Sequence, residues 1–156
     1  MPHHTIPLLQ SLLLQAEAAR DAASGLLRRA EQQMQQARQQ GDGLQQYRSE
    51  QDQRWVARLR QATVPELLHC QRSFGQRLDQ AIDLQDRTTL QLDQRVSQAR
   101  QALLAREQKV AAVRKLIERR QADQRRSADR QAQHLSDEAA QRSHGGRQPL
   151  APPTTI

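Results

Sequence analysis

The sequence predicts an all-α protein in which two long helices form an antiparallel coiled-coil hairpin with a disordered C-terminal tail. Three observations support this fold class. The helix-forming residues Ala, Leu, Gln, Arg and Glu dominate the 156 residues. Aromatic residues make up only 2% of the chain, too few for a thick globular core. Apolar residues also recur at alternating three- and four-residue steps, which is typical of a coiled-coil seam.

The first long helix is predicted over residues 6–62, after a disordered N-terminus at residues 1–5. Near Gln51 its apolar repeat slips by a four-residue step, which locally unwinds a coiled coil. The two glycines at 41 and 43 come just before this slip, so we expect a bend there. The predicted seam consists of Leu9, Leu12, Ala16, Ala19, Ala23, Leu26, Ala30, Ala37, Leu44 and Tyr47, with polar interruptions at Gln33 and Gln40.

A turn is predicted at residues 63–66, where the heptad repeat stops and restarts. The segment Thr63-Val64-Pro65-Glu66 has the form of a capping box, in which the Thr hydroxyl caps the helix and the Glu side chain returns the bond. Pro65 suits the first turn, because the backbone N–H groups there have no helical partner. A turn this short reverses the chain, so the two helices are expected to lie antiparallel.

The second helix is predicted over residues 67–142, followed by a disordered tail at residues 143–156. Because it is longer than the first helix, its part from about Ile117 to Arg142 is expected to overhang. That overhang is the first place to seek a partner. The predicted seam consists of Leu67, Phe74, Leu78, Ile82, Thr89, Leu92, Val96, Ala99, Leu103, Val110, Val113 and Ile117, with polar interruptions at Gln85 and Arg106.

The charge of the chain raises the question of a polyanionic partner. The formal net charge is +7 and the sequence pI is about 11.1. Basic and acidic residues are nevertheless interspersed, and each third of the chain has only a small basic excess. This distribution is typical of the solvated faces of a coiled coil. We therefore expect no nucleic-acid partner.

The residues that carry chemistry are sparse. Cys70 is the only cysteine, so no intrachain disulfide is possible, and a reduced, cytosolic setting is expected. No apolar run approaches the length of a membrane helix, and no signal peptide is expected. His69 and Cys70 are adjacent, so on a helix they point in different directions. The sequence predicts no catalytic, cofactor-binding or metal-binding residues, and an enzyme is the least favoured class.

Four short segments, spread over nearly the whole chain, match the pattern of one protein family. They are Leu9-Gln10-Ser11-Leu12 with Ala16-Glu17 and Asp21-Ala22-Ala23; Leu44 with Tyr47-Arg48; Phe74, Leu78, Ala81 and Ile82; and Asp137-Glu138-Ala139-Ala140-Gln141-Arg142. The last segment is the most specific. In this order the segments resemble the FliJ proteins of flagellar type III export, which are small cytosolic antiparallel coiled coils.

The resemblance implies a function in motility through protein export. It implies a stalk, similar to the central stalk of rotary ATPases, whose open ends insert in the hexameric flagellar export ATPase. The other end would reach the cytoplasmic part of the export gate membrane protein. Such a stalk would help couple ATP hydrolysis to export, would handle export chaperones, and would be cytoplasmic, associated peripherally with the inner face of the cell membrane.

The resemblance also implies two sets of partner-binding residues. The candidates for contact with the export gate lie near the turn: Leu44, Tyr47, Phe74, Leu78 and Ala81. The candidates for contact with the ATPase or its escorts lie on the overhang: Arg119, Arg120, Asp137, Glu138 and Arg142. Charge on this second set is expected to steer association more than it sets affinity.

Three other readings stay open on sequence alone. One is the equivalent stalk of a virulence-type type III secretion system, which has the same architecture. A second is a basic coiled coil that binds nucleic acid, for which affinity would fall steeply with salt. A third is an oligomeric spacer, in which polar seam residues set the register between chains.

We predict that residues after about Ile117 fray when the protein is free, because an isolated helix is marginal in water. Hydrogen exchange of the free monomer measures this directly, and fast exchange of the amides beyond Ile117 is expected. Strong protection of those amides in the monomer would contradict the prediction.

Overall fold

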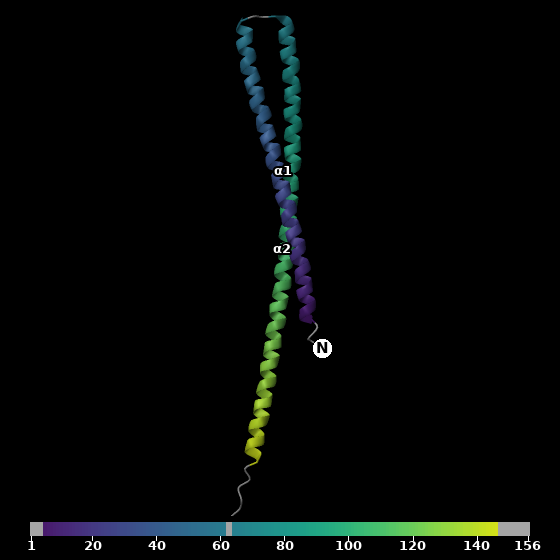
Figure 1. Cartoon of the computed structure of the whole chain (residues 1–156), viewed down its shortest axis with the longest axis vertical. Helices are drawn as coiled ribbons and strands as arrows, with labels where there is room; N and C mark the ends of the chain where they lie inside the picture. Colours follow the sequence, from purple (N-terminus) through teal and green to yellow (C-terminus); the bar gives the residue numbers. More distant parts are fainter. Residues whose placement is uncertain (1–4, 62–63, 147–156) are drawn as a thin grey trace, which may run out of the picture. The chain divides into compact units, whose positions relative to one another are not determined.

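The computed structural model describes residues 5–61 and 64–146, and these residues form two helices (Figure 1). Helix α1 is Thr5–Gln61 and helix α2 is Pro65–Gly145, with 57 and 81 residues. The described residues contain no strand, and the predicted all-α hairpin is confirmed. The predictions made for residues 1–4, 62–63 and 147–156 fall outside the described residues.

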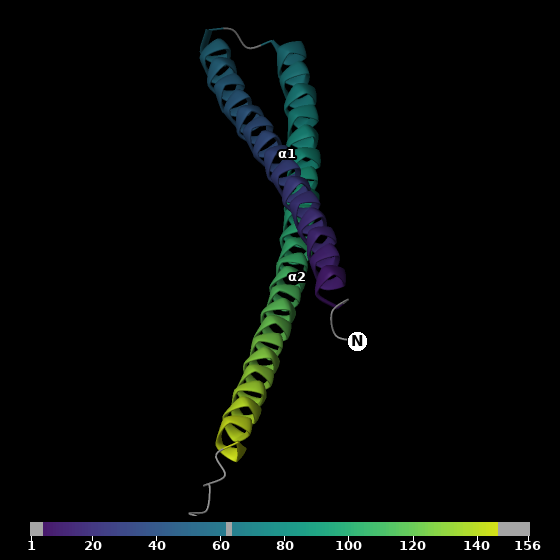
Figure 2. The same ribbon diagram turned by 60° about the horizontal axis from the view of Figure 1, so that its bottom comes forward.

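Contacts divide the chain into two compact units. One unit is Gln15–Val110, which we call the hairpin unit, and the other combines Met1–Leu14 with Ala111–Ile156. Each helix contributes a segment to both units. In the hairpin unit, the end of α1 and the start of α2 lie at the same end, and the helices run antiparallel (Figures 1 and 2).

Helix α2 begins two residues earlier than predicted. The Val64 carbonyl accepts hydrogen bonds from the backbone N–H groups of Leu67 and Leu68, at 3.0 and 3.3 Å. Val64 therefore occupies the N-cap position, and Pro65 is the first helical residue, where its missing N–H costs no bond. At its other end α2 extends three residues past the predicted limit, to Gly145.

The seam of α2 follows the predicted repeat from Leu78 onward. Val96, Val110 and Val113 are only 2–4% exposed, and Ile117 is 9% exposed. Before Leu78 the prediction differs from the structure, because Phe74 is 39% exposed and the buried position belongs to Gly75.

The seam of α1 was predicted with half of its positions one residue too early. The alanines of the repeat are buried as expected, but Leu26 and Tyr47 are 61% and 43% exposed. The half-buried positions are instead Leu13, Arg20, Leu27, Met34, Gly41 and Arg48. Adjacent apolar pairs such as Leu12-Leu13 and Leu26-Leu27 fit either phase, and the structure adopts the phase that turns Met34 instead of Gln33 toward α2. The predicted slip agrees with the half-buried Gln51, Trp55 and Leu59, which are four residues apart.

Small residues on α1 face larger residues on α2 across the hairpin seam. Gly41 lies opposite Gln85, since a Cβ at Gly41 would be 3.6 Å from the Gln85 Cγ. Because the helices are antiparallel, moving eleven residues back along α1 and eleven forward along α2 from this contact places Ala30 opposite Val96. The buried Ala16, Ala23 and Ala37 occupy the same heptad position as Ala30. Facing small and large residues fill each layer and let the helix axes approach closely.

One polar side chain bonds across this seam. The Gln85 Nε2 donates to the Ala37 carbonyl oxygen of α1 at 2.8 Å, which satisfies a part-buried amide. Helix α1 runs through Gly41 without interruption. Gln85, predicted as a polar interruption, is thus a specific contact that favours one register of the two helices.

Ion pairs bridge the helices along one flank of the seam. Arg100 Nη2 lies 3.0 Å from Glu31 Oε1, and Arg38 Nη2 lies 3.8 Å from Asp93 Oδ1. All four side chains are well exposed, so each pair contributes at most about 1 kcal/mol to stability. Their consistent spacing supports the same antiparallel register as the Gly41 and Gln85 contact.

The C-terminal part of α2 has no burial. Every residue from Arg125 to Gly146 is exposed, including Leu135 at 68%. No helix within the described residues is long and apolar enough to cross a membrane. We keep the name overhang for the segment from Ile117 to Arg142.

We predict that Gly43→Ala stabilises the hairpin by about 0.8–1 kcal/mol, the difference in helix propensity. A Cβ at Gly43 meets nothing within 4 Å. Gly75→Ala is expected to gain less, because its Cβ would lie 3.2 Å from the Arg48 Nη1 and displace that side chain. Urea unfolding of the three proteins tests this, and equal gains at the two positions would contradict it.

Candidate partner-binding surfaces

The turn end of the hairpin exposes an aromatic pair. Tyr47 of α1 and Phe74 of α2 meet edge to face, with ring centroids 6.3 Å apart and an interplanar angle of 77°. About two fifths of each side chain remains exposed. A two-helix seam is too thin to bury both rings, so they offer an apolar surface to a partner.

The other three candidate gate residues have different surroundings. Ala81 is exposed, Leu44 is half-buried, and Leu78 is buried at 7% exposure. Leu78 and Leu44 belong to the seam, whereas Tyr47, Phe74 and Ala81 lie beside it. Only these last three side chains are accessible enough to touch a partner without opening the hairpin.

A cluster of ion pairs around Arg48, next to the aromatic pair, was not predicted. Arg48 Nε donates to Asp79 Oδ1 at 2.9 Å across the helices, and Arg48 Nη1 donates to Asp52 Oδ1 at 2.5 Å along α1. The guanidinium lies over Gly75, where any larger residue would crowd it. These residues also line a shallow groove of about 320 Å³ that Leu68 borders.

The hydrogen bond to Asp79 raises the pKa of the Arg48 guanidinium above its ordinary value. The charges of Asp52 and Asp79 add to this effect, and desolvation opposes it. A raised pKa stabilises the folded state below the ordinary pKa, and this contribution is lost only as the pH rises through the raised value. Arg48 therefore stays charged at every pH at which the protein is handled, and its ion pairs do not titrate through this group.

The five candidate residues on the overhang are all exposed. Arg119 and Arg120 are adjacent in α2 and point in different directions. Further on, Arg142 Nη2 lies 3.5 Å from Glu138 Oε2, one turn earlier in the same helix. Asp137 is also exposed. The overhang thus presents charged side chains to solvent, which a partner of complementary charge can bind.

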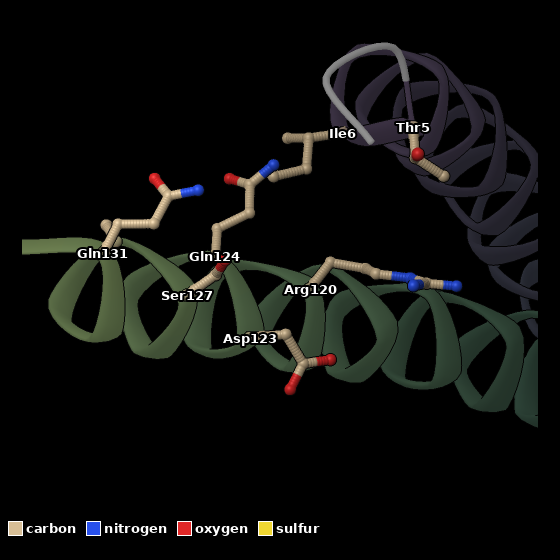
Figure 3. A pocket seen from close by; sticks show the side chains of 8 residues that line it. Thr5, Ile6, Arg120, Asp123, Gln124, Ser127 and Gln131 are labelled. Carbon is tan, nitrogen blue, oxygen red and sulfur yellow. The ribbon is translucent and has the colours of Figure 1, made fainter. Parts of the chain in front are cut away.

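Arg120 also borders a pocket between the start of α1 and the overhang (Figure 3). The pocket has a volume of about 430 Å³, and Ile6 and Gln124 point toward one another across it, whereas Asp123 points away from α1. Its lining combines an apolar side chain with amides and a guanidinium. Nothing in this arrangement forms a catalytic constellation.

Groups that could carry other chemistry are isolated. Across the described ranges 5–61 and 64–146, no three His, Cys, Asp or Glu residues are grouped to hold a metal ion. Cys70 is an exposed free thiol.

Comparison with known families favours one of the readings of the sequence. The model of a family described as Flagellar FliJ protein matches residues 6–149. The chain belongs to this family. No curated protein and no solved structure matches it. FliJ membership makes the chain a component of the flagellar export machinery, in a family of structural export components.

The structure brings together only part of each candidate set in this FliJ protein. Tyr47, Phe74 and Ala81 share one flank of the seam at the turn end. Arg48, Gly75 and Asp79, which sequence reasoning missed, lie beside them. The sequence feature that could have indicated this contact is a glycine at a seam position of α2 together with an arginine at a seam position of α1.

We predict a coupling energy of about 0.5–1.5 kcal/mol between Tyr47 and Phe74, the range for edge-to-face rings. The measurement is a double-mutant cycle with Tyr47→Ala and Phe74→Ala in urea unfolding. Leu26→Ala combined with Phe74→Ala is the control, because Leu26 lies 21 residues from Tyr47 along α1 and its change should be additive. Additive behaviour of the aromatic pair would contradict the predicted coupling.

Proposed function

We propose that this FliJ protein is a coiled-coil stalk that binds the flagellar export ATPase and the export gate. The observation that carries the proposal is the family match over residues 6–149, which includes both helices and the turn. The hairpin adds two surfaces of different chemistry, one aromatic and one charged. In this role the protein helps to couple ATP hydrolysis to export and handles export chaperones.

The gate contact is assigned to the turn end. Tyr47, Phe74 and Ala81 form its exposed part, and Leu44 and Leu78 support it from the seam. Exposed aromatic rings contribute much of the affinity of protein interfaces when a partner buries them. The T-shaped pair holds both rings in place before binding, which lowers the entropy cost of association.

The ATPase contact is assigned to the overhang. Arg119, Arg120, Asp137, Glu138 and Arg142 are exposed there, on a part of α2 whose C-terminal turns are exposed on every side. From Arg125 onward every described residue of the helix is exposed, so apolar and charged faces are available there to a ring of subunits. If this segment becomes ordered only when it binds, the entropy lost on ordering reduces the affinity, so the contact can form and dissociate readily.

The proposed location follows from these partners. A protein that binds the cytoplasmic part of the gate is cytoplasmic and is associated with the inner face of the membrane through the export apparatus. The virulence-type stalk is less favoured, since the matching family is flagellar. The interspersed charges of the described helices do not favour the nucleic-acid reading.

We predict that the two surfaces fail separately. Tyr47→Ala with Phe74→Ala should weaken binding to the cytoplasmic part of the gate protein and leave ATPase binding unchanged. Arg119→Glu with Arg120→Glu should have the reverse effect. Truncation after Ile117 should abolish both ATPase binding and stimulation of hydrolysis. Pull-downs at modest salt and an ATPase assay with the cognate ring make these measurements.

Leu78 is not a suitable test position, because its replacement would remove a buried side chain and unfold part of the hairpin. Loss of both partners in both double variants would indicate general unfolding, which circular dichroism detects. Binding of neither partner by the unmodified protein would contradict the stalk proposal. If the aromatic double variant lost ATPase binding and the arginine double variant lost gate binding, the stalk proposal would stand, with the two partners assigned to the opposite ends.

A further inference from the structure

The two flanks of the hairpin seam differ in charge. When the seam positions of the heptad are labelled a and d, positions e and b form one flank, and positions g and c form the other. Between Gln15 and Val110 the sequence holds twelve acidic residues, and all but Glu50 and Glu66 lie on the e/b flank. From residues 19 to 47 and 74 to 109, the g/c flank has no acidic residue.

The structure confirms that these flanks are on opposite sides of the seam. The ion pairs of Arg100 with Glu31 and of Arg38 with Asp93 join e positions. The contact of Tyr47 with Phe74 joins g positions. The backbone of Arg48 lies at a seam position, and its guanidinium pairs with Asp79 on the e/b flank.

The cations of the g/c flank lack the partners that the other flank provides. Arg29, Arg77, Arg95 and Lys109 are exposed, and none of them forms an ion pair within the described part of the chain. Apolar side chains lie between them, including Leu84 at 66% and Leu26 at 61% exposure. The flank therefore combines unpaired positive charge with exposed apolar surface and carries no negative charge.

We infer that the g/c flank of the hairpin unit is a docking surface for an amphipathic helix of a partner protein whose apolar stripe is bordered by Asp and Glu. Leucines and alanines of the flank would meet the stripe, and the four cations would meet the acidic borders. Such a helix would lie along the seam as a third helix.

The spacing of the cations favours a helix over a nucleic acid. Arg77, Arg95 and Lys109 are 18 and 14 residues apart, which is about 27 and 21 Å along α2. A DNA duplex carries a charge about every 1.7 Å and requires a denser row of cations. A helix with a few acidic residues along its borders matches a cation every few turns.

A second copy of the chain fits this flank less well. In a two-fold symmetric dimer through this flank, cations would face cations, and no acid of the flank would offset them. The acids of the second copy lie on its e/b flank, on the opposite side of the seam, so a two-fold symmetric contact through the g/c flank does not bring them to the cations.

The test uses the full chain and a synthetic peptide of about 28 residues, or about 42 Å as a helix. The peptide carries Leu at a and d and Glu at e and g, where like charges discourage its self-association. The comparison probes are the same peptide with Lys in place of Glu, and single-stranded DNA of similar length. Fluorescence anisotropy at low salt gives each Kd.

The variants are matched in residue type and exposure. Leu84→Glu with Arg95→Glu alters the g/c flank, at positions outside the proposed gate contact. Leu90→Glu with Arg87→Glu is the control on other faces of α2, because Leu90 is 63% exposed and Arg87 is exposed without a described ion pair. Circular dichroism verifies that both variants fold as the unmodified chain does.

We expect the acidic peptide to bind the unmodified chain. In the g/c variant, charge reversal and lost apolar contact should raise the Kd for this peptide at least about tenfold. The Kd of the control variant should stay within about twofold of the unmodified value.

Absence of acidic-peptide binding, equal weakening by both variants, or equal binding of the Lys peptide would overturn the inference. Tighter binding of DNA that the g/c variant abolishes would assign the flank to nucleic acid instead. A dimer in sedimentation that only the g/c variant dissociates would assign it to a second copy. These results do not depend on the ATPase assay, so the stalk proposal and this inference fail separately.

Discussion

Close packing of small residues on α1 against larger residues on α2 is the constraint on which the hairpin depends. Ala16, Ala23 and Ala37 are among the most buried residues of α1, and Val96 is the most buried of α2. A seam of this kind is thin, because every second seam position of α1 between Ala16 and Ala37 is an alanine. Register is consequently critical, since a shift of one residue would bring glutamines into these layers.

Polar contacts then select the register that the apolar layers permit. Gln85 reaches the Ala37 carbonyl beside Gly41, and Arg48 reaches Asp79 over Gly75. In both places a long polar side chain of one helix lies against a glycine of the other, and at Gly75 the missing side chain leaves room for the Arg48 guanidinium. These contacts add little stability individually, but a shifted register would leave the part-buried Gln85 amide without its acceptor and would separate Arg48 from Asp79.

Sequence periodicity predicted α2 more accurately than α1 for a physical reason. From Leu78 to Ile117 the apolar residues of the α2 seam are mostly single branched or aliphatic side chains, so only one phase satisfies the pattern. In α1, neighbouring apolar residues and abundant alanine satisfy two phases, and only packing against α2 decides between them. The Arg48 cluster could not be predicted, because its partner Asp79 is 31 residues away and depends on the register. The candidate gate set was taken from the family resemblance and mixed exposed Phe74 with buried Leu78, because the resemblance carries no information on burial.

A thin seam also determines what kind of function the hairpin can have. Two helices cannot cover their own flanks, so leucines such as Leu26 and Leu84 stay exposed as a direct result of the architecture. A third helix can be accommodated along such a surface. The distribution of acids then distinguishes the two flanks. On the e/b flank, acids such as Glu31 and Asp93 pair with arginines across the seam, and on the g/c flank the cations remain available to a partner.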